Sequence, residues 1–451
     1  MGALTGWALA SCVAASALAA PPSAPRAGEG DLRVRLLAVD FPFTALHGGE
    51  FPSMQQSLLL TGDLAQLAHH SAFRALAPLD PPWGRWARFG AVAAIDLVGF
   101  TWADVWMHEE WHRAVLTVHG IPSFNDALTL TLRNGGISVS HVADADLVRL
   151  KAESNPDMVR LMEAGMEAEL ELVRRFRKTS FSDGLDALPG VMAAWYASVS
   201  VLGYRQTCAS AEADALTDEF NATEGGDVAI RDFTGLDCTA WIYDLDRPGE
   251  PYAARGVHPS GVGIDRYIRY SDLSALEQGY LRSVRTMGLL NLAAPYLFGF
   301  SRFTSASPFD GKPFQWSVAL VHHLTAYGQE LSLDVLLGRA PWNLFASYHH
   351  GMNLRGGFPG LELEVARYPL FYEGQRFELT AGAMAWLQPE GLAFHADKAR
   401  PGGLLRALIE LPASEHVRPF FELEAKTEGW VAGNVYTGPA VSFRGGVTLV
   451  P

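Results

Sequence analysis

The segment from Trp106 to Val115 reads WMHEEWHRAV and contains two histidines four residues apart, His108 and His112. Residues four apart project from one face of a helix, so the two imidazoles can bind one zinc ion. Glu109 points about 100° away from His108, where it can take a proton from a water molecule instead of binding the metal. This H-E-x-x-H pattern predicts a zinc site that performs hydrolysis.

A second predicted helix supplies candidates for the third ligand that a catalytic zinc site needs. Its sequence LMEAGMEAELELVRR places Glu163, Glu167 and Glu171 on one face. A buried row of carboxylates is costly unless a cation compensates it, and zinc would do so. We predict Glu167 as the third ligand and Glu163 as its alternative, while a solvated acidic face is the other interpretation. Asp104, one turn before His108, is predicted to orient a ligand histidine from behind.

Long helices are expected to position these residues. Residues 83–121 run without proline and are rich in helix-forming residues, and residues 155–179 form the acidic helix, with Asn155 as its expected N-cap. The apolar parts of residues 187–206 and 280–300 are about 15–17 residues long, shorter than the roughly 20 residues of a membrane span. We expect them to be buried core helices, with membrane-associated helices as the alternative.

The pattern changes after residue 312. Short segments such as GLELEVARY and RFELTAGAMAWL alternate between apolar and polar residues and are separated by turn residues. They predict an antiparallel β domain of about eight strands over residues 312–451, either a barrel or a sandwich. The fold class is therefore α+β, with a mostly helical zincin-like domain over residues 36–311. In an exported chain the alternation is also typical of an outer-membrane barrel.

The N-terminus predicts export. Residues 1–20 are apolar and end in small residues, as in a signal peptide, and residues 21–35 form a flexible leader. We expect the chain in the periplasm or outer membrane of a Gram-negative bacterium. In such a compartment Cys208 and Cys238 are expected to form a disulfide that closes the polar loop 208–238, with two unpaired buried thiols as the alternative.

The composition excludes some classes of partner. The 451 residues carry a net charge of −14, and no basic cluster is present, so nucleic acid is not an expected partner. The sequence contains no phosphate loop or dinucleotide fingerprint, so no nucleotide is expected either. The hydrophobic content of 49% leaves membrane association open.

Residues 90–275 resemble a known family. The H-E-x-x-H pattern, a glutamate on a later helix and the segment VHPSGVGIDRYIRYSDL are similar to the M48 group of gluzincin metallopeptidases. The resemblance implies Zn²⁺ held by His108, His112 and Glu167, with Glu109 as general base, and His258 with Arg266 lining the cleft and stabilising the oxyanion.

The sequence thus predicts an exported zinc metallopeptidase that cleaves protein or peptide substrates. The alternative is an outer-membrane β-barrel protein whose helical periplasmic domain acts as a structural or assembly factor without turnover. Replacement of Glu109 distinguishes the two, because it removes turnover only in the first case.

Overall fold

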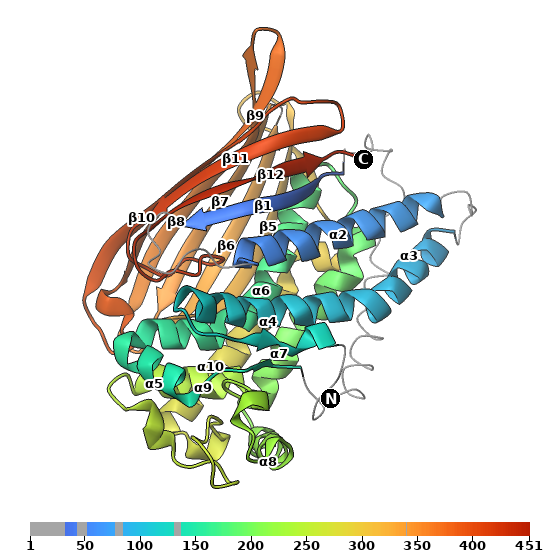
Figure 1. Cartoon of the computed structure of the whole chain (residues 1–451). Helices are drawn as coiled ribbons and strands as arrows, with labels where there is room; N and C mark the ends of the chain where they lie inside the picture. Colours follow the sequence, from blue (N-terminus) through green and yellow to red (C-terminus); the bar gives the residue numbers. More distant parts are fainter. Residues whose placement is uncertain (1–31, 43–51, 77–83, 130–136, 340) are drawn as a thin grey trace.

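Helices in the N-terminal half and a large antiparallel sheet in the C-terminal half form an α+β structure, which confirms the predicted fold class (Figure 1). The computed structural model describes residues 32–42, 52–76, 84–129, 137–339 and 341–451. The predicted signal peptide and most of the predicted leader lie outside these residues.

Nine α-helices are found in the described ranges: α2 (Met54–Ala75), α3 (Gly84–Ile95), α4 (Thr101–Val118), α5 (Asp144–Glu153), α6 (Asn155–Ser182), α7 (Val191–Cys208), α8 (Glu212–Glu224), α9 (Asp237–Asp246) and α10 (Ala275–Gly288). Figure 1 shows α2, α6 and α4 as neighbouring layers on the inner side of the curved sheet. The apolar residues of α7 are buried as expected for a core helix, among them Ala193, Ala194 and Ala197.

Helices α3 and α4 are continuous through a π-helical turn, Asp96–Phe100. Within the described residues, the combined helix Gly84–Val118 is the one that is long and apolar enough to cross a membrane. Its second half is a core helix, since Met107, Trp111 and Val115 are buried against the other helices.

Helix α6 lies at the centre of the structure and is buried along most of its length. Its N-cap is Ser154, whose hydroxyl accepts a hydrogen bond from the backbone N–H of Asp157, and not Asn155 as predicted. The side chain of Asn155 accepts a hydrogen bond from Lys151 instead, at 2.5 Å, so it is engaged elsewhere.

The sheet has ten strands: β1 (Val34–Pro42), β4 (Phe303–Ala306), β5 (Pro313–Thr325), β6 (Gly328–Arg339), β7 (Trp342–Met352), β8 (Gly357–Tyr372), β9 (Gln375–Pro389), β10 (Ala399–Glu410), β11 (Val417–Lys426) and β12 (Ala440–Leu449). Neighbouring strands follow the chain from β4 to β12, and every pair is antiparallel. The eight strands from β5 to β12 are those expected after residue 312.

The boundary of the β domain differs from the prediction at both ends. Strand β1 lies beside the C-terminal strand β12, with Val34 opposite Leu449, so residues assigned to the leader and to the helical domain belong to the sheet. Strand β4 adds four residues that precede position 312. Both strands pair with an edge that only the folded sheet provides, and this pairing is not visible in the local sequence.

Ion pairs join the inner face of the sheet to α6. Arg174 donates to Asp334 on β6 at 2.9 and 3.0 Å, Arg177 reaches the same carboxylate at 3.2 Å, and Lys178 pairs with Glu364 on β8. The two arginines and both carboxylates are nearly excluded from water, whereas 27% of the Lys178 side chain is exposed. They are tolerated because each has a partner of opposite sign.

Replacement of Asp334 by alanine would leave two buried guanidinium groups without their shared carboxylate. We expect the free energy of unfolding of Asp334→Ala to fall by about 3–5 kcal/mol, measured by urea denaturation followed by circular dichroism. The matched control Glu428→Ala breaks an exposed pair with Arg400 and should change that free energy by less than about 1 kcal/mol. Similar losses in both variants would contradict a stabilising role for the inner ion pairs.

Candidate metal centre

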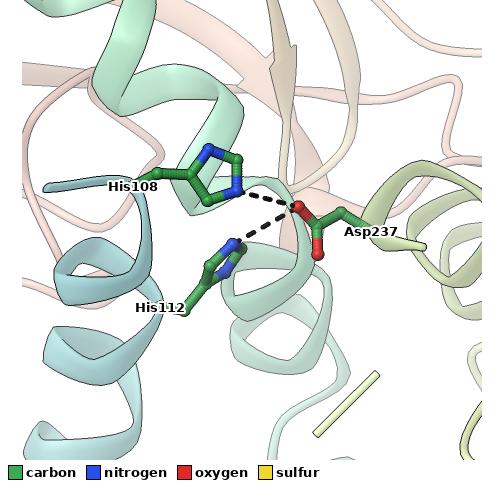
Figure 2. A group of neighbouring side chains, drawn as sticks. All are labelled: His108, His112 and Asp237. Carbon is green, nitrogen blue, oxygen red and sulfur yellow. Dashed lines mark hydrogen bonds and ion pairs between the residues drawn. The ribbon is translucent and has the colours of Figure 1, made fainter. Parts of the chain in front are cut away.

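Helix α4 carries the two predicted histidines on the face that meets α6 and α9 (Figure 2). Trp111 and Ala114, on the same helix, are fully buried in the core and fix its rotation. The helical spacing of four residues therefore brings the two imidazoles together, with ring centroids 5.0 Å apart.

Both histidines converge on Asp237, the first residue of α9. Oδ2 of Asp237 lies 3.3 Å from Nε2 of His108 and 3.3 Å from Nε2 of His112 (Figure 2). The three ligand-type atoms lie within 4.8 Å of one another. The side chains of His112 and Asp237 are buried, whereas 15% of the His108 side chain is exposed, so solvent reaches the group from the His108 side.

Hydrogen bonds show which nitrogen of each imidazole, in His108 and in His112, carries a proton. Nδ1 of His112 lies 2.7 Å from the carbonyl oxygen of Leu161, which can only accept, so this nitrogen donates. Nδ1 of His108 likewise donates to the Glu169 carboxylate, at 2.8 Å. In the neutral rings both Nε2 atoms then present lone pairs to the Asp237 carboxylate. The lone pairs of these nitrogens and the carboxylate oxygen repel one another unless a cation lies between them. In metal sites, ligand histidines are oriented by the same kind of hydrogen bond from Nδ1.

Gly165 on α6 allows the two imidazoles to pack closely against this helix. A Cβ atom at this position would lie 2.2 Å from Nε2 and 2.3 Å from Cδ2 of His108, and 2.4 Å from Nε2 of His112. Any larger side chain would therefore displace both rings from their positions beside Asp237.

Two contacts from α7 hold Asp237 in place. The hydroxyl of Tyr204 accepts a hydrogen bond from the backbone N–H of Asp237 at 2.9 Å. Cys208, at the end of α7, forms a disulfide with Cys238, the residue directly after Asp237, with 6.0 Å between the Cα atoms. The predicted disulfide is confirmed, and it ties the first turn of α9 to α7 next to the carboxylate.

The electrostatics of this group favour a positive charge at its centre. Burial raises the pKa of Asp237, but the two histidines outweigh burial and lower it to about 2. Burial lowers the pKa of His108, but its hydrogen bonds to Asp237 and Glu169 hold this pKa well above its ordinary value. A proton on His108 supplies the positive charge that the Asp237 carboxylate favours, and a metal ion would supply it in the same way.

Glu109 is buried beside the same three groups. Burial raises its pKa to about 7, against the opposing effect of the charges on His108 and His112. A general base works best when its pKa lies near the operating pH, so this carboxylate suits the role that the sequence predicts for it.

The structure places the two predicted third ligands elsewhere. Glu167 forms an ion pair with Arg160 and accepts a hydrogen bond from the backbone N–H of Gly433. Glu163 accepts hydrogen bonds from Arg160 at 2.9 Å and from Trp430 at 2.5 Å. Both carboxylates are buried and do need a cation, as argued from the sequence, but the cation is the guanidinium of Arg160. The carboxylate beside the histidines is that of Asp237, which corrects the predicted ligand set.

Asp104 does not orient a histidine as predicted. It is buried, and neither of its carboxylate oxygens has a hydrogen-bond partner among the described residues. The carboxylate of Glu169 accepts the hydrogen bond from Nδ1 of His108 instead.

The structure does not bring His258 and Arg266 into the group. The Nδ1 atom of His258 lies 2.8 Å from the hydroxyl of Ser260, within its own loop. Arg266 is fully buried and donates to the Asp144 carboxylate and to three backbone carbonyl groups. Its donors are therefore used in holding loops together and are not free to stabilise an oxyanion.

Sequence reasoning missed Asp237, Glu169 and Gly165. One available signal was Arg160, which precedes Glu163 by three residues and Glu167 by seven and so shares their helix face. It could have indicated a buried ion pair in place of a metal ligand. No local pattern marks Asp237, because its role depends on where α9 packs.

Comparisons of the chain with protein-family models, with curated proteins and with solved structures found no match. The donor atoms of His108, His112 and Asp237 therefore indicate which metal this group can bind. Two imidazole nitrogens and one carboxylate oxygen form a donor set that suits Zn²⁺ and leaves a coordination position for water or substrate. The same set also binds Fe²⁺ in other proteins, so the donor types alone allow either metal.

A methyl group at position 165 should displace the two imidazoles, because its carbon would lie 2.2 Å from Nε2 of His108 and 2.4 Å from Nε2 of His112. We expect purified wild-type protein to take up about one zinc ion per chain and Gly165→Ala to take up almost none, measured by elemental analysis after dialysis. The matched control is Gly203→Ala on α7, where an added Cβ meets nothing within 4 Å, and it should bind zinc like the wild type. Circular dichroism checks that both variants are folded. Full zinc uptake by folded Gly165→Ala would show that the metal does not bind here.

Glu169 should matter for affinity without touching the metal. We expect Glu169→Ala to weaken zinc binding about 10- to 100-fold, because His108 loses the acceptor that orients its ring and raises its basicity. Competition with a chromogenic chelator measures this change. Glu219→Ala, on the exposed side of α8, removes the same charge far from the histidines and should leave the affinity unchanged.

Proposed function

We propose that the chain is an exported zinc-dependent hydrolase that cleaves peptide bonds, with His108, His112 and Asp237 as metal ligands. The observation that carries the proposal is the convergence of both Nε2 atoms and one carboxylate oxygen of Asp237, which lie within 4.8 Å of one another. The peptidase activity is supported by the H-E-x-x-H pattern and by its resemblance to gluzincin metallopeptidases. Asp237 takes the place of the glutamate that this resemblance implies, and aspartate is equally a zinc ligand.

In this proposal His108, His112 and Asp237 would bind the metal, and Glu109 would transfer the protons. A bound zinc ion would supply Lewis acidity to the scissile carbonyl and to a water molecule. Glu109 would accept a proton from the attacking water and then donate it to the leaving amine. Leu161 and Glu169 keep the two histidines in the tautomer that exposes Nε2. The burial of His112 and Asp237 limits water around the reacting atoms, which strengthens these electrostatic effects.

A second candidate is a protein without turnover, in which the metal group stabilises the helices next to a large β domain. Its supporting observation is the sheet of ten strands, which is tied to α6 by buried ion pairs. In that case the group still binds zinc, but the carboxylate of Glu109 has no function in chemistry.

Glu109→Gln separates the two candidates. For the hydrolase we expect cleavage of a quenched-fluorescence peptide library to fall about 10²- to 10⁴-fold with unchanged zinc content, since an amide cannot take a proton from water. The matched control is Glu110→Gln, one residue along α4, whose carboxylate bonds to Asn125 and Arg113 instead of facing the histidines. This control should retain activity.

His112→Ala should lose both zinc and turnover. The hydrolase proposal fails if zinc-loaded wild-type protein shows no cleavage that Glu109→Gln abolishes. It also fails if the wild-type protein takes up no metal after reconstitution with Zn²⁺.

A further inference from the structure

We infer that the outer face of the sheet lies against the hydrocarbon of a lipid bilayer, so that strands β6 to β12 and β1 are inserted in a membrane. This inference does not rest on the proposed hydrolase activity. It rests on the distribution of polar and apolar side chains over the two faces of the sheet.

The outer face is apolar on strands β6 to β12 and on β1. One row of directly paired residues crosses seven strands, from β6 to β12: Val335, Ala346, Leu363, Ala383, Leu405, Ala425 and Val441. The side chains in the neighbouring rows are also apolar, and many are exposed, including 67% of Leu405, 56% of Leu423 and 46% of Leu363. On β1, which pairs with β12, Val39 and Phe41 continue the same face.

The inner face of the same strands is charged. Its buried charged residues include Glu330, Asp334, Glu362, Glu364, Glu424 and Arg444. Most are satisfied by ion pairs: Arg406 donates to Glu362 at 2.8 Å, and Arg444 donates to Glu422 at 2.7 Å. A cavity of about 240 Å³ lies among these residues, between α6 and the strands.

This arrangement is the reverse of a sheet in water. A water-soluble sheet turns its apolar side chains towards the core and its charged side chains outwards. An exposed apolar patch on a soluble monomer rarely exceeds a few hundred Å², whereas this face extends over eight strands. Apolar side chains outside and charged side chains inside are the pattern of a transmembrane β-sheet.

The dimensions and the borders of the face also fit a bilayer. The strands from β6 to β12 have between 10 and 16 residues, and a tilted transmembrane strand needs about 9–11. Aromatic residues gather at one end, where the rings of Trp342 and Tyr368 lie 4.6 Å apart and Tyr372 is 67% exposed. Tyrosine and tryptophan concentrate at the border between hydrocarbon and water in membrane proteins.

A bilayer fits this face better than a second protein. The helices lie on the inner side of the sheet, and the sheet is curved (Figure 1). The apolar rows continue on the other face from β6 to β12 and on to β1. One flat protein surface cannot cover a curved face of this extent, whereas lipid chains adapt to it.

Fluorescent labels at defined positions test the inference on the full chain. In a Cys12→Ser background the remaining cysteines are paired in the disulfide, so Leu363→Cys or Leu405→Cys introduces a single reactive thiol for an environment-sensitive dye. The labelled proteins are folded into vesicles of dioleoylphosphatidylcholine, with or without doxyl-labelled phosphatidylcholine. The matched control is Ala222→Cys, exposed on α8 at a distance from the sheet (Figure 1).

We expect both sheet labels to be quenched at least about twofold by the doxyl lipid, while the label at position 222 is not quenched. Protein that remains outside the vesicles, or sheet labels that are quenched no more than the control, would overturn the inference. A blue shift of the sheet labels without vesicles, together with a doubled mass in solution, would also overturn it, because the face would then be covered by a second copy.

A charge on this face gives an independent measurement. We expect Leu363→Arg to lower the vesicle-bound fraction at least about tenfold, because arginine on the lipid face opposes insertion. Thr223→Arg on α8 adds the same charge outside the sheet and should leave binding unchanged. Equal binding of the two variants would contradict a lipid-facing position for Leu363.

Discussion

The burial of charged residues on α6 is the constraint on which the rest of the structure depends. A buried charge without a partner costs several kcal/mol, so every ionic group of this central helix must meet an opposite charge or a hydrogen-bond donor. Arg160 satisfies Glu163 and Glu167, and Arg174 meets Asp334 on the sheet. The pair with Asp334 ties α6 to the strands, and the pair of Arg175 with Asp63 ties it to α2.

The same helix builds the candidate metal centre from its other side. Gly165 leaves room for the two imidazoles, the carbonyl of Leu161 and the carboxylate of Glu169 orient them, and the ion pairs towards the sheet keep the helix from shifting. A rigid support of this kind is what a preorganised site requires. The disulfide next to Asp237 adds a covalent tie on the opposite side of the group.

The two proposals describe a hydrolase attached to a membrane through its sheet. The charged inner face of the sheet gives α6 its ionic partners, while the apolar outer face would interact with lipid. The candidate metal centre lies among the helices and not in the sheet, and 15% of the His108 side chain is exposed.

The sequence by itself determined the features that depend on near neighbours along the chain. Alternation predicted the eight strands from β5 to β12, and helical spacing predicted that His108 and His112 share a face. Two cysteines in a chain predicted to be exported indicated the disulfide. Only the tertiary structure decided which carboxylate meets the histidines and that β1 completes the sheet beside β12. Those contacts join residues far apart in the chain, and packing selects them. Glu167 fitted the helical pattern as well as any ligand, but its partner was decided by the buried guanidinium of Arg160 on its own helix.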